Sequence, residues 1–199
     1  RDSGVTNSSD VNAGTNFTNV ISAEGSNTWT VYCNDSAGNL NYSSVTFSKD
    51  TIAPSINFTN PSESPGATLF TRNNILVNVT ANDTNFVNIT IKLYNSTNSL
   101  INSSNSTSNS LFANFTNLAN GIYFFNATAY DNAGNLNNTE TRNVTISYDA
   151  TYPIFSNFWD NNASLTGSGI GLFNATINNT NGTAWLQINN TNVTATNIT

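Results

Sequence analysis

Histidine and methionine are missing from the chain, and cysteine occurs once, at Cys33. Without histidine, the chain lacks the usual general base at neutral pH, the serine–histidine triads and the commonest ligand of transition metals. A single cysteine cannot form a disulfide within the chain. Since free cysteine is usually buried, we expect Cys33 to be a small buried thiol.

Charged residues are scarce as well, at 8% of the chain against about 25% in typical globular proteins. The five lysines and arginines are scattered along the sequence, so no basic stripe marks a nucleic-acid surface. The eleven acidic residues bring the net charge to −6, but none has the paired spacing of an acid/base couple. We therefore expect no enzymatic site. A glycosidase built on two distant carboxylates is the catalytic alternative that the sequence leaves open.

Long apolar runs are also absent. No stretch of about 18 apolar residues occurs, so we expect no membrane span in this segment. No initiator methionine or signal peptide is present, and we expect a processed product or a section of a longer repeat protein. Hydrophobic residues make up 37% of the chain, which is enough for packed cores, while asparagine, threonine and serine supply the polar surface.

The sequence does contain a repeated hairpin. In the segment GIYFFNATAYDNAGNLN, from Gly121 to Asn137, apolar and polar residues alternate up to a cluster of turn formers at Asp131. This period of two predicts a half-buried strand, and the turn formers predict a short hairpin turn. The residues expected on the buried side are Tyr123, Phe125, Ala127 and Ala129.

The same pattern occurs earlier, in GSNTWTVYCNDSAGNLN from Gly25 to Asn41. Here Trp29, Val31 and Cys33 take the inward places. A further echo follows each copy, because Asp50-Thr-Ile-Ala-Pro54 is similar to Asp149-Ala-Thr-Tyr-Pro153. The two copies lie about 100 residues apart, the size of one immunoglobulin-like sandwich.

This hairpin and exit linker resemble those that end the Ig-like repeats of bacterial and archaeal surface proteins. The resemblance implies an all-β chain of tandem immunoglobulin-like β-sandwich modules. Residues 1–50 would form the C-terminal half of a module, residues 51–150 a complete module, and residues 151–199 the N-terminal half of another. In the complete module we expect about seven strands. We expect Val77, Val79, Ile89, Ile91 and Phe125 in one core, and we also place Val87 inward. The segment 95–109 is nearly all asparagine, serine and threonine and is expected to be an exposed loop or a poor edge strand.

Three aspartates, Asp50, Asp149 and Asp160, fall near the expected module junctions. Calcium prefers clustered oxygen ligands and often lies at junctions of extracellular modules. No D-x-D-x-D run supplies the six or more oxygens that calcium needs, so caps of turns are the favoured interpretation and no cofactor is expected.

N-glycosylation sequons are dense. Period two sends the asparagine and the threonine of a strand sequon outward together, while the middle residue enters the core. Asparagine is a poor strand former, so its abundance in strands favours a role as glycan acceptor, although an Asn/Thr-rich chain also produces sequons by chance. The candidate acceptors are Asn16, Asn34, Asn41, Asn57, Asn78, Asn88, Asn114, Asn126, Asn143 and Asn174.

These features favour an extracellular structural protein of the cell surface, and the composition resembles archaeal surface glycoproteins. Each half-module would expose the apolar face that its missing sheet should cover, and exposed faces and strand edges recruit partners. We therefore expect copies to join head-to-tail into a filament or surface layer. The alternative is the stalk of an adhesin. The residues expected at the assembly interface are Trp29, Val31, Phe47, Leu172, Phe173 and Trp185.

Overall fold

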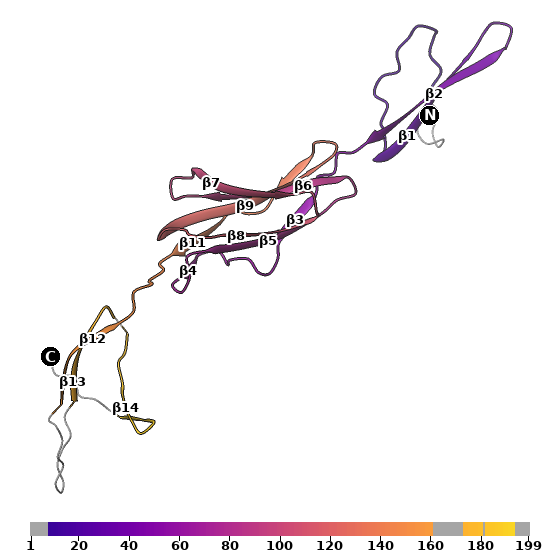
Figure 1. Cartoon of the computed structure of the whole chain (residues 1–199). Helices are drawn as coiled ribbons and strands as arrows, with labels where there is room; N and C mark the ends of the chain where they lie inside the picture. Colours follow the sequence, from indigo (N-terminus) through magenta and orange to yellow (C-terminus); the bar gives the residue numbers. More distant parts are fainter. Residues whose placement is uncertain (1–7, 161–172, 181, 194–199) are drawn as a thin grey trace. The chain divides into compact units, whose positions relative to one another are not determined.

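A computed structural model describes residues 8–160, 173–180 and 182–193. These residues form strands β1 to β15 and no helix, so the fold class is all-β (Figure 1). In the described part of the chain, no helix is long and apolar enough to cross a membrane. The chain divides into two compact units, residues 1–147 and 148–199, and each is described by itself.

The first unit contains a complete two-sheet sandwich (Figure 1). One sheet has the order β3-β5-β8. The other has the order β4-β11-β9-β6-β7, with β10 also paired to β9. The strands of the first sheet are β3 (Ser55–Phe58), β5 (Ile75–Asn82) and β8 (Ser110–Phe115). Those of the second are β4 (Ala67–Leu69), β6 (Phe86–Tyr94), β7 (Leu100–Ser106), β9 (Gly121–Asp131), β10 (Leu136–Asn138) and β11 (Arg142–Ile146). All pairings are antiparallel except that of β4 with β11, which is parallel.

The core lies between these two sheets and follows from the alternation of each strand. The residues that the sequence assigns to it are buried together, which confirms the predicted register: Val77, Val79, Ile89, Ile91 and Phe125 are 0% exposed, and Tyr123 is 8% exposed. Phe125 of β9 meets Phe58 of the opposite sheet edge to face, with ring centroids 5.5 Å apart. The two sheets are therefore joined by direct ring contact.

Val87 is an exception to the predicted pattern. It is 39% exposed rather than inward. Phe86 pairs with Asp131 and Asn88 with Tyr130, so Val87 is an extra residue in a bulge of β6. A bulge changes the side to which a strand residue points, and alternation in the sequence alone does not reveal it.

The asparagine- and serine-rich segment 95–109 contains the edge strand β7. An edge strand was one of the two structures expected for this segment, the other being an exposed loop. Its residues are mostly exposed, and it pairs only with β6. Polar side chains on an edge strand discourage further pairing with other chains.

Before the sandwich lies a hairpin of β1 (Gly25–Asn34) and β2 (Leu40–Lys49), a sheet of its own (Figure 1). Strand register places Trp29, Val31 and Cys33 on one face with Phe47. The face is the expected one, but it is open: Val31 is 50% exposed and Trp29 and Phe47 are half-buried. Cys33 is exposed, and the expectation of a buried thiol is wrong for the chain alone. Among the described residues of the first unit, no second sheet covers this face.

The second unit contains two small sheets, β12-β13 and β14-β15. The strands are β12 (Ile154–Asp160), β13 (Phe173–Asn178), β14 (Leu186–Ile188) and β15 (Thr191–Val193). These strands fall in the half-module expected over residues 151–199, but residues 161–172, including the predicted interface residue Leu172, lie outside the described residues.

Candidate functional site

The repeated turn motif is a hydrogen-bonded loop with the same geometry in both copies. Asp131 Oδ1 accepts hydrogen bonds from the amides of Ala133 (2.9 Å) and Asn135 (2.8 Å), and Asp131 Oδ2 accepts one from Asn135 Nδ2 (2.7 Å). Asp35 makes the corresponding bonds to Ala37 and Asn39. The DxAGN motif is therefore accounted for by the turn itself.

These bonds shift the acidity of both aspartates. Burial raises the pKa of Asp131, but the hydrogen bonds from Asn135, Ala133 and Gly134 outweigh it and hold the pKa below the ordinary value of 3.8. The side chain and amide of Asn39 lower the pKa of Asp35 in the same way. Both turns are thus built around an ionised carboxylate, because only the charged form accepts all of these bonds.

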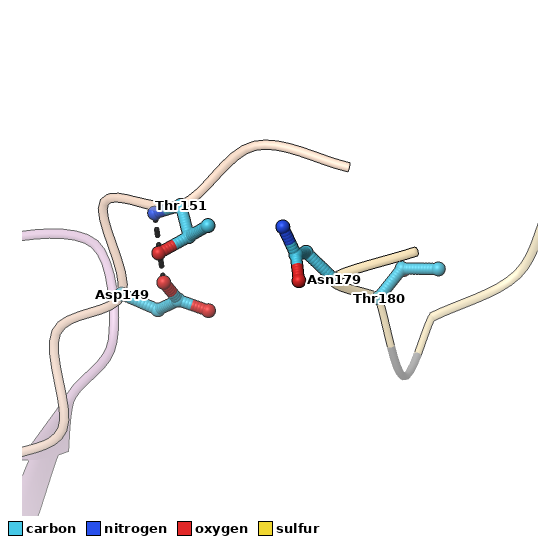
Figure 2. Close-up of a pocket in the computed structure, with 4 residues that line it drawn as sticks. All are labelled: Asp149, Thr151, Asn179 and Thr180. Atoms are coloured by element: carbon cyan, nitrogen blue, oxygen red, sulfur yellow. Dashed lines mark hydrogen bonds between the residues drawn. The ribbon is translucent and has the colours of Figure 1, made fainter. Parts of the chain in front are cut away.

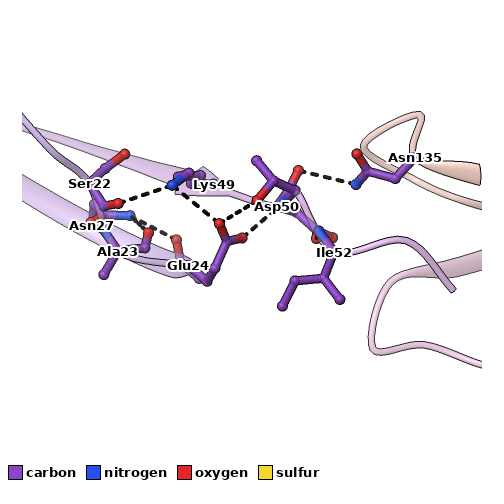
Figure 3. Close-up of polar contacts among 10 residues, drawn as sticks. Ser22, Ala23, Glu24, Asn27, Lys49, Asp50, Ile52 and Asn135 are labelled. Carbon is purple, nitrogen blue, oxygen red and sulfur yellow. Dashed lines mark hydrogen bonds and ion pairs between the residues drawn. The ribbon is translucent and has the colours of Figure 1, made fainter. Parts of the chain in front are cut away.

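The segment between the hairpin and the sandwich is held by polar contacts (Figure 3). Glu24 accepts hydrogen bonds from the amide (2.9 Å) and hydroxyl (2.6 Å) of Thr51, and it pairs with Lys49 at 3.2 Å. The hydroxyl of Thr51, followed by its amide, lowers the pKa of Glu24. On the sandwich side, Asn135 Nδ2 donates to the carbonyl of Asp50 at 3.2 Å, and Asn85 Nδ2 donates to Asp50 Oδ2 at 2.6 Å. These contacts fasten the start of the linker to the turn of the repeat motif.

The carboxylates of Asp50, Asp83 and Asp131 come within 4.8 Å of one another at this place. Only Asp50 was a candidate from the sequence; Asp83 and Asp131 are brought to it by the fold. Three carboxylates supply at most six oxygens, the lower end of the six to eight that calcium takes. The oxygens of Asp131 already serve the turn, and one oxygen of Asp50 serves Asn85. A cation bound here would share these oxygens with the hydrogen bonds that hold the junction.

Asp149, a second junction candidate, lines a shallow depression in the second unit with Thr151, Asn179 and Thr180 (Figure 2). Its Oδ1 accepts the amide of Thr151 at 2.8 Å, which is the turn-capping role expected from the sequence. Asp160 forms the end of β12. A second depression, in the first unit, lies beside Phe58 and Arg142. Neither depression joins two carboxylates, or a nucleophile to a base, in the way that acid/base or covalent catalysis needs.

The predicted interface residues of the hairpin lie together on its open face. Trp29 and Phe47 meet edge to face with ring centroids 5.0 Å apart, and Val31 continues the same side of β1. The indole Nε1 of Trp29 is buried and has no hydrogen-bond partner among the described residues. In the complete sandwich the repeat-equivalent residues of β9 are Phe125, Ala127 and Ala129, each 0% exposed. Equivalent positions of the two repeat copies are thus covered in the complete module and uncovered in the hairpin.

The second unit presents a comparable open face. Phe173 of β13 lies near Phe158 of β12, with ring centroids 6.5 Å apart, and the two side chains are 59% and 65% exposed. Phe155 lies across from Ile177 on this side and is 54% exposed. Its repeat equivalent in the complete module, Ile56, is 6% exposed. Trp185, the remaining predicted interface residue, is also exposed and immediately precedes β14.

The candidate glycan acceptors are all at the surface, and none is buried. Those classed as exposed are Asn16, Asn34, Asn41, Asn57, Asn114, Asn143 and Asn174, and those half-buried are Asn78, Asn88 and Asn126. The half-buried ones have partners or constraints: Asn78 Nδ2 donates to the carbonyl of Asn60 (2.7 Å) and Asn126 Nδ2 to Thr141 (3.1 Å). Asn88 Oδ1 is buried without a hydrogen-bond partner.

No family model matches the chain, and no curated protein is similar to it at a significant level. Solved structures do show similarity. An engineered protein aligns with a TM-score of 0.37 and 18% identity over 47% of this chain, which spans about a fifth (20%) of that protein. CopC from Methylosinus trichosporium OB3b aligns with a TM-score of 0.38 and 14% identity, over 49% of this chain and 99% of CopC. The fibronectin(III)-like modules of CbhA from Clostridium thermocellum align with a TM-score of 0.37 and 22% identity, over 46% of this chain and 94% of theirs.

Proposed function

We propose that this chain is a non-enzymatic structural subunit of an extracellular filament or surface layer. Its copies would assemble head-to-tail and carry N-linked glycans. The proposal rests on the contrast between equivalent positions in the two copies of the repeat. Phe125, Ala127 and Ala129 are fully covered in the complete sandwich, whereas Val31 and Cys33 are exposed on the hairpin.

The occupant proposed for the hairpin face is the β12–β13 face of another copy. In the repeat, β12 follows Pro153 as β3 follows Pro54, so β12–β13 corresponds to the sheet that covers β9 in the complete module. Both faces carry aromatic side chains, and burying each one contributes about 1.5–3 kcal/mol.

A contact between two different faces of the same chain does not close on itself. Each copy that joins through its β12–β13 face leaves its own hairpin face open, so growth continues as a filament. Completion of a sheet sandwich by strands of a neighbour is a known mode of strand recognition between proteins. The low charge favours such contact, because few like charges oppose one another.

The test uses two variants that each spoil one face. Val31→Asp places a charge on the hairpin face, and Phe173→Asp places one on the β12–β13 face. Both residues are at least half exposed in the chain, so neither change disturbs a core. Sedimentation velocity should show growing species for the unchanged chain, little growth for each variant alone, and dimers when the two variants are mixed. Val87→Asp, on the exposed bulge of β6, is the matched control and should assemble normally.

A chain that stays monomeric at all concentrations, or that closes into symmetric dimers, would overturn the filament proposal. The stalk of a cell-surface adhesin would then be the better assignment. The glycan part is tested separately, by intact-mass measurement of material from the native source. A mass equal to that of the bare chain would contradict it.

A further inference from the structure

The strand register shows that sequon asparagines lie directly across from outward apolar side chains. On the outer face of β5 and β8, Asn78 pairs with Phe112, and Asn114 pairs with Leu76. Phe112 is 51% exposed and Leu76 is half-buried. The four side chains therefore form a square in which two acceptors occupy one diagonal and two apolar groups the other.

The same juxtaposition occurs on other sheets of the molecule. On the outer face of the larger sheet, Asn143 of β11 pairs with Phe124 of β9, and Asn88 of β6 pairs with Tyr130. In the second unit, Asn174 of β13 pairs with Trp159 of β12, and that indole is 55% exposed. We refer to Leu76, Phe112, Phe124, Tyr130 and Trp159 as the platform residues.

Platform residues do not belong to the sandwich core. Those of the first unit alternate with core residues and point away from the core. On β5 and β8 their face also carries polar residues such as Thr80 and Ser110, whereas on the larger sheet Phe124 also pairs with Tyr94 and Tyr130 with Leu136. Single exposed apolar residues are common on protein surfaces. Here, however, an apolar residue recurs directly across from a sequon asparagine on three different sheets. A partner that covers the ring gives it a reason to be apolar.

Directly opposed residues on neighbouring strands have Cβ atoms about 4.5–5.5 Å apart. A sugar bonded to the asparagine Nδ2 begins a few bond lengths above the sheet, within reach of the opposing ring. Pyranose rings present C–H groups on their faces, and aromatic faces attract such positive edges. Covering the ring also removes apolar surface from water.

The acceptor amides are compatible with this modification. Asn114 uses its Oδ1 to accept a hydrogen bond from Asn74 (2.8 Å), which leaves Nδ2 for a sugar. Asn78 donates one N–H to Asn60. A glycosylated amide keeps one N–H, so that bond can persist.

We propose that the platform residues bind the first sugar of N-linked glycans carried by the asparagines across from them. This inference rests on the N-glycosylation in the proposed function and specifies which glycans are held against the sheet. In the covalent step, Asn Nδ2 forms a bond to the anomeric carbon of a polyprenyl-phosphate-linked sugar. The bond from that carbon to the phosphate oxygen breaks, the phosphate leaves with the electron pair, and the amide gives one proton to a base of the transferase.

The experiment measures the effect of Phe112→Thr on the thermal midpoint of the full chain, in glycosylated and in unglycosylated material. Glycosylated chain comes from a host with a polyprenyl-phosphate-dependent transferase, and peptide mapping reports the occupancy of Asn78. The midpoint should fall by about 3–6 °C more in the glycosylated chain than in the bare one. Thr80→Ala removes the sequon while keeping Asn78, and it should abolish that difference.

The matched control is Lys92→Thr, across from the candidate acceptor Asn126 on β9, where the opposed residue is not apolar. Its effect should be the same with and without glycan. In addition, sugar C–H proton resonances should shift upfield beside the Phe112 ring and return in Phe112→Thr. Occupied Asn78 with equal midpoint shifts and no upfield resonances would overturn the platform inference alone. Bare asparagines in both native and host-glycosylated material would overturn the inference together with the glycan part of the proposed function.

Discussion

Phe125 offers the sharpest test of the sandwich. Its side chain is 0% exposed, it pairs with Leu93 across β6, and its ring meets Phe58 of the other sheet at 5.5 Å. Truncation to alanine removes these contacts and leaves a cavity between two sheets that cannot collapse freely. The expected loss is about 3–5 kcal/mol of unfolding free energy. For a module of this size, that loss lowers the thermal midpoint by more than about 12 °C.

The matched control is the neighbouring residue of the same strand. Phe124 points to the outer face and is half-buried, so Phe124→Ala should cost about 1 kcal/mol in unglycosylated protein. Both variants are compared by urea unfolding monitored by circular dichroism, with midpoints and slopes fitted together. An equal or larger loss for Phe124→Ala would show that β9 is shifted by one residue, which would reverse every facing assignment in the sheet.

Three further outcomes are expected from the same structure. Cys33 is exposed in the chain alone, whereas its repeat equivalent Ala129 is 0% exposed. Maleimide should therefore label Cys33 quickly in dilute protein and at least about 100-fold more slowly in assembled protein, and equal rates would contradict completion of the hairpin face. The pKa of Asp131 lies below 3.8 in the folded chain, so its turn contributes stability above the unfolded pKa that is lost as pH falls through the folded pKa. Asp131→Asn should flatten this acid limb in pH-dependent melting, and an unchanged limb would assign it to other groups. Because carboxylate oxygens of Asp50, Asp83 and Asp131 already accept hydrogen bonds from the chain, adding about 1 mM calcium should leave the melting midpoint unchanged, and a rise would show a real site.

Alternation of residue types was enough to predict the core of the complete module, because the inward positions of β5, and those of β9 from Tyr123 to Ala129, are apolar and each strand is long. Alternation failed at Val87, where one inserted residue changes the phase of β6. It also placed Cys33 on the correct face but misjudged its exposure, since burial depends on a second sheet and the described part of the first unit has none over that face. The alternation in a strand predicts which face of the sheet each side chain is on, but the exposure of that side chain depends on whether another sheet covers the face.

Candidate sites were harder to predict, because they depend on which distant residues the fold brings together. Asp83 joins Asp50 and Asp131 from separate turns, and no spacing in the sequence indicates this. The sequons themselves were visible in the sequence, but the residue across from each acceptor was not. That Phe112 faces Asn78, and Trp159 faces Asn174, follows only from strand register.

The parallel pairing of β4 with β11 has a mechanical consequence. Ala67 to Leu69 lie beside Val144 to Ile146 in the same direction, and flanking bonds run from Gly66 N to Asn143 O (2.8 Å) and from Ser147 N to Leu69 O (2.9 Å). Tension along the chain pulls β4 toward its start and β11 toward its end, so the two strands are drawn past each other. The hydrogen bonds between them then share the force and must break together, whereas in an antiparallel pair pulled open from one end they would break one at a time.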